Sequence, residues 1–144
     1  MEEISFKQKA ILVLLNADAK KPMSPIQIMK SLFIYSKEDR PKKFYKFKPY
    51  LYGPCSLEVY SDLRKLISEG FITAYSSFYS WSFYRITTKG EKLLIKLDFT
   101  DDKLKEIKKT VLSKSFIGLV KDIYSKYPKF AKHSIINKGI LKNL

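Results

Sequence analysis

FKPYLYGPCSLEVYSDLRKLISEGFI, residues 47–72, contains the strongest structural signals in this chain of 144 residues. Gly53 and Pro54 predict a tight turn, because glycine adopts backbone angles that other residues avoid and the residue before a proline avoids the right-handed helical region. Apolar side chains then recur at helical spacing over residues 57–69, and Gly70 predicts the end of that helix. The stretch is therefore expected to form a turn followed by an amphipathic helix.

The hydrophobic period changes after this helix from about 3.6 to about 2. Residues 71–75 and 81–87 read as two strands, and residues 76–80 as the turn between them. Residues 87–90 lead into another helix, in which Leu93, Leu94 and Leu97 are apolar. This part of the chain is expected to form a β-hairpin that leads into another helix.

Two further helices are expected before the quoted stretch. Residues 6–16 carry apolar side chains at helical spacing after Ser5, which is a suitable N-cap. Ser24 followed by Pro25 predicts the start of the second helix, because proline is favoured at the first helical position. Residues 37–48 are polar and rich in lysine, and we call this segment the basic loop.

The order of helix, helix, basic loop, helix, hairpin and helix is typical of the winged helix-turn-helix arrangement. The expected fold class is therefore mainly α with a small β-hairpin. Residues 1–100 would form this domain, and residues 101–144 a basic, helical C-terminal extension. One last helix is expected over residues 102–127, up to Pro128. Its apolar residues lie on more than one side, which suggests a homodimer formed through this helix.

The quoted stretch also resembles a known family. The SocA-type antitoxin (Panacea) domain and its prokaryotic relatives often carry a phrase built on PY-x-YGP, a serine and a helix that ends in glycine. The matching residues here are Pro49, Tyr50, Tyr52, Gly53, Pro54, Ser56, Tyr60, Leu63, Leu66, Gly70 and Ile72. The resemblance covers about residues 5–97. It implies a winged-helix fold and a role in prokaryotic regulation, toxin–antitoxin systems or phage defence, and it identifies no partner.

The charge of the chain is its most informative bulk property. Lys and Arg number 28 against 14 Asp and Glu, so the formal net charge is +14. Residues 103–144 hold eleven lysines against Glu106 and Asp122, a net charge of +9. Such a chain attracts polyanions, of which nucleic acid is the first candidate. AT-rich coding or a hot habitat is the alternative explanation for the lysine excess.

The positive charge is almost entirely lysine, because Arg40, Arg64 and Arg85 are the only arginines. Lysine acts as a point charge on phosphate, whereas arginine is the preferred bidentate reader of guanine. The composition therefore favours attraction to the backbone over dense reading of bases. The leading prediction is a cytoplasmic, non-enzymatic, winged-helix regulatory protein that binds nucleic acid, with double-stranded DNA as the expected partner.

The candidate nucleic-acid-binding residues lie on the third helix, in the basic loop and in the hairpin. They are Ser61, Arg64, Lys65, Ser68, Arg40, Lys42, Lys43, Lys46, Lys48 and Arg85. Three carboxylates on the same helix, Glu58, Asp62 and Glu69, roughly cancel its basic residues, so an ordinary solvated helix is the alternative. Phe44 and Phe47 of the basic loop are expected in the core.

The alternative function is protein binding. An antitoxin-like or adaptor module would bind a toxin or a protease through an aromatic turn and the wing. The residues that would carry this function are Tyr50, Tyr52, Phe78, Tyr79 and Trp81. The opposing interpretation is that the turn tyrosines pack internally and that the aromatics of the hairpin tip fold back over the last helix.

Other function classes have little support in the sequence. One cysteine and one histidine cannot build a cysteine-rich zinc site, and no cofactor motif is present. Cys55 precedes a helix whose dipole could lower the pKa of its thiol, but no acid is placed to orient His133 as its base. No apolar stretch approaches the ~20 residues that span a membrane. We therefore expect no catalytic residue, no metal, no cofactor and no membrane partner.

Overall fold

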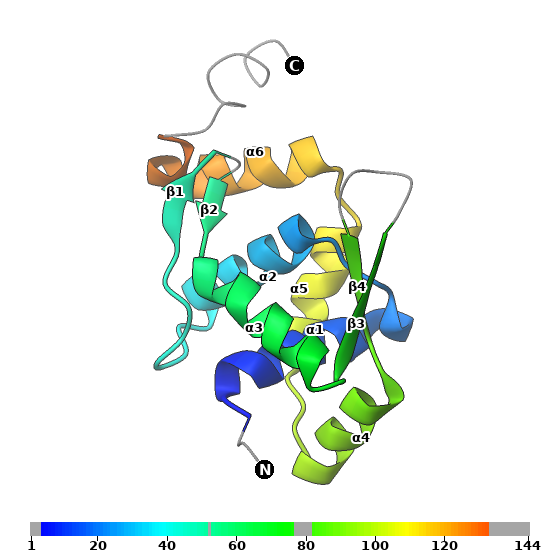
Figure 1. Cartoon of the computed structure of the whole chain (residues 1–144). Coiled ribbons are helices and arrows are strands. Elements are labelled where there is room, and N and C mark those ends of the chain that lie inside the picture. Colours follow the sequence, from blue (N-terminus) through cyan, green and yellow to red (C-terminus); the bar gives the residue numbers. More distant parts are fainter. Residues whose placement is uncertain (1–3, 52, 77–81, 133–144) are drawn as a thin grey trace.

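The computed structural model describes residues 4–51, 53–76 and 82–132 (Figure 1). Over these ranges the chain is mainly helical with two small antiparallel sheets, as the sequence predicts at this level. The helices are α1 (Phe6–Lys20), α2 (Pro25–Glu38), α3 (Leu57–Ser68), α4 (Thr88–Leu97), α5 (Asp102–Leu112) and α6 (Phe116–Lys126), with a 3-10 turn η1 (Pro128–Ala131). The strands are β1 (Lys48–Tyr50), β2 (Gly53–Cys55), β3 (Ile72–Ser76) and β4 (Ser82–Ile86). None of the described helices is both long and apolar enough to span a membrane.

α1 and α2 begin where the sequence predicts, and each begins with a capping box. The Ser5 hydroxyl accepts a hydrogen bond from the backbone N–H of Gln8, and the Gln8 side chain accepts one from the Ser5 backbone. Ser24 and Gln27 make the same pair of bonds at the start of α2. The backbone of α1 leaves helical angles at residues 17–19, beyond the helix expected over residues 6–16.

β3 and β4 form the expected hairpin, with Ile72 opposite Ile86. Both isoleucines are buried, so this pair anchors the hairpin to the helices. The segment between α1 and α2 joins the hairpin through two backbone hydrogen bonds of Met23 with Tyr84, at 3.1 and 2.9 Å. The hairpin therefore packs against the start of α2 as well as against α1 and α3.

A second hairpin, β1–β2, stands at the tight turn expected between α2 and α3. Gly53 has a φ of 102°, in the region that favours glycine. A Cβ atom on Gly53 would stand 3.1 Å from the Nζ atom of Lys30. Lys30 is buried, and its Nζ donates to the carbonyl of Pro54 at 3.4 Å. The turn therefore closes over a lysine of α2.

The prediction of a single last helix over residues 102–127 is wrong, because this range forms two helices, α5 and α6. The Ser113 hydroxyl donates to the carbonyl of Thr110 at 2.7 Å, and the Ser115 hydroxyl accepts from the N–H of Gly118 at 3.0 Å. Serine side chains compete with the helix backbone in this way and favour helix ends. Ser115 is the N-cap of α6, which crosses the top of the molecule in Figure 1.

α5 and α6 share one hydrophobic core with the helices that precede them. Leu104, Ile107 and Val111 of α5 are buried, and α5 lies against both α1 and α2. Leu119 and Ile123 of α6 are buried in the same cluster. The apolar stripes that suggested a homodimer are therefore covered within the chain for the most part, while Phe116 of α6 is exposed.

Lys108 fastens α5 to the end of α1. Its side chain is fully buried, and its Nζ donates to the carbonyl of Ala17 at 2.7 Å and to that of Leu15 at 3.3 Å. Carbonyls at a helix C-terminus lack intrahelical donors, so the ammonium supplies the missing bonds. Burial lowers the pKa of Lys108 to about 8, because the charged form loses its hydration.

We expect Lys108→Met to alter the pH dependence of stability. A lysine whose pKa falls from 10.5 to about 8 on folding releases its proton earlier in the folded state, so the free energy of unfolding rises with pH between these values. This group should contribute a rise of the order of 1–2 kcal/mol between about pH 8 and pH 9.5, and the variant should lose that rise. Urea unfolding across this range measures the effect, with exposed Lys109→Met as the control. Parallel pH profiles for Lys108→Met and the unchanged chain would contradict this role.

Candidate nucleic-acid interface

The basic loop is held by two consecutive aromatic side chains that face inward. Phe44 packs against the rings of Phe6 and Tyr35, with centroid distances of 6.0 and 5.4 Å. The Tyr45 hydroxyl donates to the Asp62 carboxylate on α3 at 2.5 Å. Burial raises the pKa of Tyr45 far above its usual range, so the hydroxyl keeps the proton that it donates. The loop is thereby attached to α1, α2 and α3.

The charged residues of the basic loop face outward. Arg40, Lys42, Lys43, Lys46 and Lys48 are exposed, as the sequence predicts for phosphate-binding residues. Lys37 at the end of α2 is half-buried. The sequence prediction that the loop aromatics lie in the core is confirmed for Phe44, which is buried, while Phe47 is half-buried and packs on the core.

An aromatic cluster centred on Phe33 joins this loop to the C-terminal part of the chain. The fully buried Phe33 ring lies 5.5 Å from Phe47, 5.1 Å from Tyr127 and 4.7 Å from Phe130, measured between centroids. All three contacts are close to edge-to-face, the favoured geometry for aromatic pairs. As a result η1 lies against β1, although about 80 residues separate them in sequence.

Lysines from both segments stand on this cluster. The Lys37 Nζ lies 5.7 Å from the Phe33 centroid and 5.5 Å from the Phe130 centroid. The Lys129 Nζ lies 5.2 Å from the Phe130 centroid. Two basic stretches that are distant in sequence therefore meet on one side of the molecule. We call this surface the basic edge; its residues are Lys37, Arg40, Lys42, Lys43, Lys46, Lys48 and Lys129.

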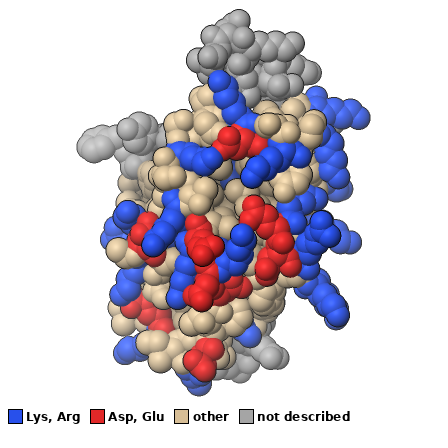
Figure 2. Space-filling model, turned by 180° about the vertical axis from the view of Figure 1, so that it is seen from behind, with Lys and Arg blue, Asp and Glu red and all other residues tan. Residues whose placement is uncertain are grey.

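The basic edge stands apart from the mixed charges of the neighbouring face. Figure 2 shows Lys and Arg along its right-hand border, the side on which β1 and the basic loop lie, and Asp and Glu gathered toward the middle. Salt bridges occupy much of that mixed face; examples are Lys103 with Glu38, and Lys114 with Asp122. The surplus positive charge is therefore most concentrated, on the view that Figure 2 gives, at the border.

α3 directs its carboxylates toward the rest of the protein. The Glu58 carboxylate accepts from the Lys7 ammonium at 2.8 Å. Asp62 accepts from the Gln8 amide at 3.0 Å in addition to its bond with Tyr45. Two of the carboxylates that the sequence places on this helix, Glu58 and Asp62, are thus engaged by α1 and the basic loop. These contacts also place α3 beside the basic loop.

The remaining surface of α3 carries the predicted base-reading residues. Ser61, Arg64 and Ser68 are exposed, and Lys65 is half-buried. The Ser68 hydroxyl donates to the carbonyl of Lys65 at 3.0 Å, so it is engaged with its own helix. Arg64 lies close enough to Tyr84 of β4 to oppose the rise in the pKa of Tyr84 that burial causes. Arg64 is therefore a cation on the side of α3 that faces Tyr84.

The predicted residues of the hairpin are only partly covered by the structure. Arg85 is exposed, and its guanidinium lies 5.4 Å from the centroid of Tyr75. β3 and β4 stand on the opposite side of the molecule from β1 (Figure 1), so Arg85 is remote from the basic edge. Four predicted partner-binding residues lie outside the described residues: Tyr52, Phe78, Tyr79 and Trp81.

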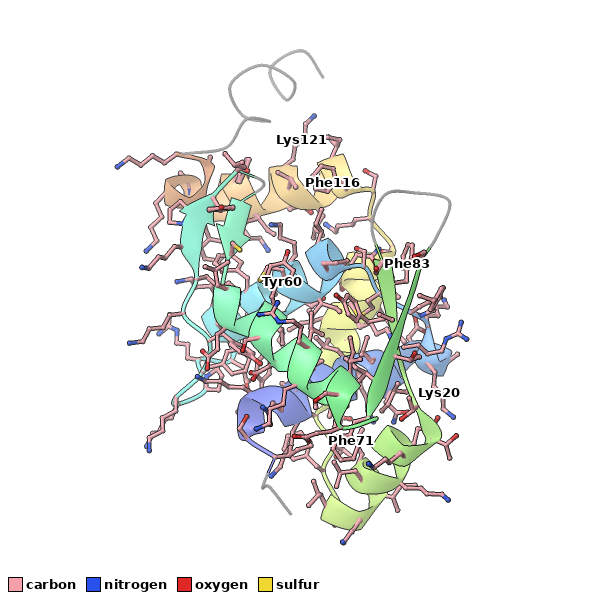
Figure 3. All side chains as sticks on the ribbon, viewed as in Figure 1. Lys20, Tyr60, Phe71, Phe83, Phe116 and Lys121 are labelled. Atoms are coloured by element: carbon pink, nitrogen blue, oxygen red, sulfur yellow. The ribbon has the colours of Figure 1, made fainter. Side chains whose placement is uncertain are left out.

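The fifth partner-binding candidate, Tyr50, belongs to an exposed apolar surface. Its side chain is 56% exposed, and that of Leu57 at the start of α3 is 74% exposed. Both border a cavity of about 270 Å³ that reaches Lys30 and Cys55. A larger, mainly apolar groove of about 600 Å³ lies beyond it; Figure 3 labels three of its lining residues, which are Tyr60, Phe83 and Phe116.

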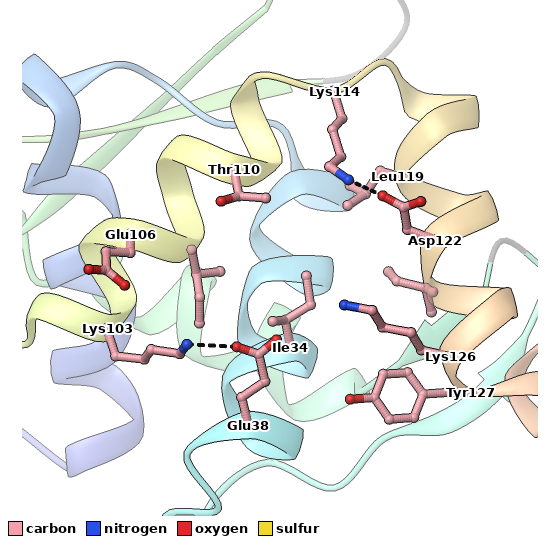
Figure 4. A pocket seen from close by; sticks show the side chains of 12 residues that line it. Ile34, Glu38, Lys103, Glu106, Thr110, Lys114, Leu119, Asp122, Lys126 and Tyr127 are labelled. Atoms are coloured by element: carbon pink, nitrogen blue, oxygen red, sulfur yellow. Dashed lines mark hydrogen bonds and ion pairs between the residues drawn. The ribbon is translucent and has the colours of Figure 1, made fainter.

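A third cavity, of about 140 Å³, lies between α2, α5 and α6 (Figure 4). Its floor includes Ile34 and Leu119, and charged side chains of both signs surround it. Lys103 bonds to Glu38 at 2.8 Å, and Lys114 bonds to Asp122. Because carboxylates already neutralise these lysines, the cavity has no surplus charge to offer a polyanion.

The chemistry of Cys55 differs from that of an activated nucleophile. The thiol is half-buried, and burial raises its pKa, with Lys30 opposing the change. The expected lowering of the pKa at a helix N-terminus is therefore not found. No group of three His, Cys, Asp or Glu side chains that could hold a metal ion occurs within the described ranges.

Sequence reasoning placed Lys37 among the cations of the basic loop, but it did not name Lys129 individually as a binding residue. The signal that could have found Lys129 is the pattern Tyr127, Lys129, Phe130, because it repeats the alternation of lysines and aromatics seen in the basic loop. A comparison with known families and proteins adds no further guide: no family model matches the chain, and neither does any curated protein.

We expect Tyr45→Phe to weaken the attachment of the basic loop. Loss of the hydrogen bond to a charged acceptor should lower the free energy of unfolding by about 1.5–3 kcal/mol. Urea unfolding measures the change, and Asp62→Asn together with the double variant completes a mutant cycle. Exposed Ser61→Ala is the control and should change stability by less than about 0.5 kcal/mol. Additive losses in the two single variants would show that the side chains do not interact.

Proposed function

We propose that this protein binds double-stranded DNA through the basic edge, as a non-enzymatic winged-helix regulatory protein. The observation that carries the proposal is the contact of η1 with β1 at the Phe33 cluster, which brings Lys37 and Lys129 together beside the exposed cations of the basic loop. Phosphate contacts by lysine supply affinity that does not depend on base sequence. α3, which lies beside the loop, would supply sequence preference through Arg64 and Ser61.

Two features support the winged-helix part of the proposal. Three helices precede the β3–β4 hairpin, and a single-residue bridge, Met23 with Tyr84, joins the segment between α1 and α2 to that hairpin. One feature departs from the usual pattern. A helix-turn-helix has a turn of about 3–4 residues between its helices, whereas residues 39–56, including β1 and β2, separate α2 from α3 here. In this protein the connection itself would be a DNA-binding element.

We expect the affinity for a DNA duplex to fall steeply as the salt concentration rises. The double variant Lys48→Ala, Lys129→Ala should show a weaker dependence on salt. Each lost phosphate contact should lower the slope of log K against log salt by about 0.9, so the double variant should lose about 1.8. Fluorescence anisotropy with a labelled duplex measures the slope. Lys92→Ala with Lys96→Ala on α4 removes the same charge from exposed positions away from the basic edge, and should change the slope little.

Equal effects of the two double variants would show that total charge, rather than the basic edge, governs binding. Absence of duplex binding at low salt would reject the proposed function.

A protein-binding function is the second candidate, and the exposed apolar surface at the β1–β2 hairpin favours it. Tyr50, Leu51 and Leu57 are large, exposed apolar side chains near one cavity. Contiguous apolar surface of this kind often marks an interaction site. Tyr50 shares β1 with Lys48 of the basic edge, so the two functions are better separated at Leu57 on α3.

We expect Leu57→Ser to remove a stoichiometric protein partner, such as a toxin or protease, if this second function is correct. Affinity purification from the native cell and quantification of the retained protein measure the effect. Ile95→Ser is the matched control, because Ile95 on α4 is 78% exposed and lies away from the cavity. Equal retention by both variants would count against a partner at this surface, and neither variant should alter affinity for DNA.

A further inference from the structure

We propose that the hollow formed by the basic loop is a binding site for a phosphomonoester: the terminal phosphate of a DNA strand or the phosphate of a free nucleotide. The DNA form of this proposal rests on the proposed function, whereas the nucleotide form does not. The site would make the protein sensitive to the ends of DNA in addition to its general attraction to the backbone.

The hollow is open to solvent, has a mainly polar lining and is large enough to admit a phosphate group. Its volume is about 420 Å³, within the range of about 300–1,000 Å³ typical of ligand pockets. Three lysines line it: Lys37, Lys43 and Lys46. The other lining groups include Ser36 and the aromatic residues Phe44, Tyr45 and Phe47. No carboxylate lines the hollow among the described residues, in contrast to the cavity in Figure 4.

The backbone of one of these lysines is held in an unusual conformation. Lys43 has a φ of 52°, in the left-handed region that non-glycine residues seldom adopt. Such a conformation is unfavourable for a residue with a Cβ atom, and it persists where surrounding contacts enforce it. Here the enforcing contacts are the ring packing of Phe44 and the hydrogen bond of Tyr45 to Asp62. Lys43 and Lys46 flank this anchored pair in the chain.

The third lysine approaches from a different element. Lys37 lies in the last turn of α2, and its Nζ stands over the rings of Phe33 and Phe130 at 5.7 and 5.5 Å. Favourable contact between an ammonium and the face of an aromatic ring restricts where this long side chain can go. Phe33 and Phe130 border the hollow's neighbourhood without lining it, so Lys37 is restricted at the edge of the hollow while Lys43 and Lys46 come from the anchored loop.

The charge of the site selects a phosphomonoester over an internal phosphodiester. A phosphomonoester carries about −1.5 to −2 at neutral pH, whereas each diester of the backbone carries about −1. Three ammonium groups therefore gain more from a terminal phosphate. A strand end can also enter a hollow, because the chain continues from only one side of its phosphate. The half-buried ring of Phe47 at the border offers a surface on which the attached base could stack.

The test compares two duplexes of the same sequence, one with 5′-phosphates and one with 5′-hydroxyls, by competition in fluorescence anisotropy. We expect the unchanged protein to bind the phosphorylated duplex about tenfold more tightly, the gain from one or two additional charge-assisted hydrogen bonds. Lys43→Gln with Lys46→Gln should abolish this preference. Lys42→Gln with Lys48→Gln removes equal charge from the basic edge without touching the hollow, so that variant should bind both duplexes more weakly but keep the preference.

A second measurement uses adenosine monophosphate and inorganic phosphate alone, followed by chemical-shift changes of the backbone amides of residues 36–47. Changes that vanish in Lys43→Gln with Lys46→Gln, in a variant that unfolds at the same temperature as the unchanged protein, would support the site. Binding of the nucleotide without any binding of duplex would support the free-nucleotide form and reject the proposed function. Equal affinity for the two duplexes together with no response to either small anion would overturn the inference and leave the proposed function standing.

Discussion

The packing of aromatic rings on Phe33 is the contact on which the basic edge depends. Phe33 lies on α2, and three rings surround it. The centroid distances are 5.5 Å to Phe47, just before β1, 5.1 Å to Tyr127, just after α6, and 4.7 Å to Phe130 in η1. Bringing lysines from two chain segments together opposes folding, because like charges repel across a few ångströms. Burial of the aromatic surface offsets this repulsion, and the ring faces accept Lys37 and Lys129 directly. The lysines of the two segments can therefore stand close together on this cluster.

Polar contacts of two carboxylates, Asp62 and Glu58, fix the position of α3. Asp62 receives bonds from α1 and from the basic loop, and Glu58 pairs with α1. These carboxylates hold three elements in register instead of facing solvent as unpaired charges. The helix that the winged-helix interpretation assigns to base contacts is therefore fixed relative to the loop assigned to phosphate contacts. A DNA-binding protein needs such a fixed relation, because phosphate contacts set the register in which bases are read.

Two lysines show why net charge overstates the charge available to a partner. Lys30 and Lys108 are buried, and burial lowers the pKa of each to about 8. Both donate to backbone carbonyls, one at the β1–β2 turn and the other at the end of α1. Their role is to satisfy backbone groups inside the protein. Since they count toward the formal charge of +14, the outward-facing surplus is smaller than composition suggests.

Local patterns in the chain were sufficient to predict most of its elements. Capping serines, Pro25, Gly53 and the change of hydrophobic period identified the first three helices, the tight turn and the β3–β4 hairpin, since each signal acts over a few neighbouring residues. The same reasoning failed at Ser113–Ser115, where apolar spacing continues across a break that serine side chains stabilise. It also identified the cations of the basic loop as exposed residues.

The arrangement of those cations was beyond local reasoning. No pattern in neighbouring residues indicates that Phe33 collects rings from residues 47, 127 and 130, because that contact forms only when α6 returns across the molecule. Likewise, the sequence shows Asp62 only as a charged residue on a helix. Its role as the acceptor for the Tyr45 hydroxyl follows from tertiary packing. The residue types and the helices are encoded over short distances. The surface on which the charges meet is a property of long-range packing, in which apolar burial outweighs the repulsion of the lysines that it gathers.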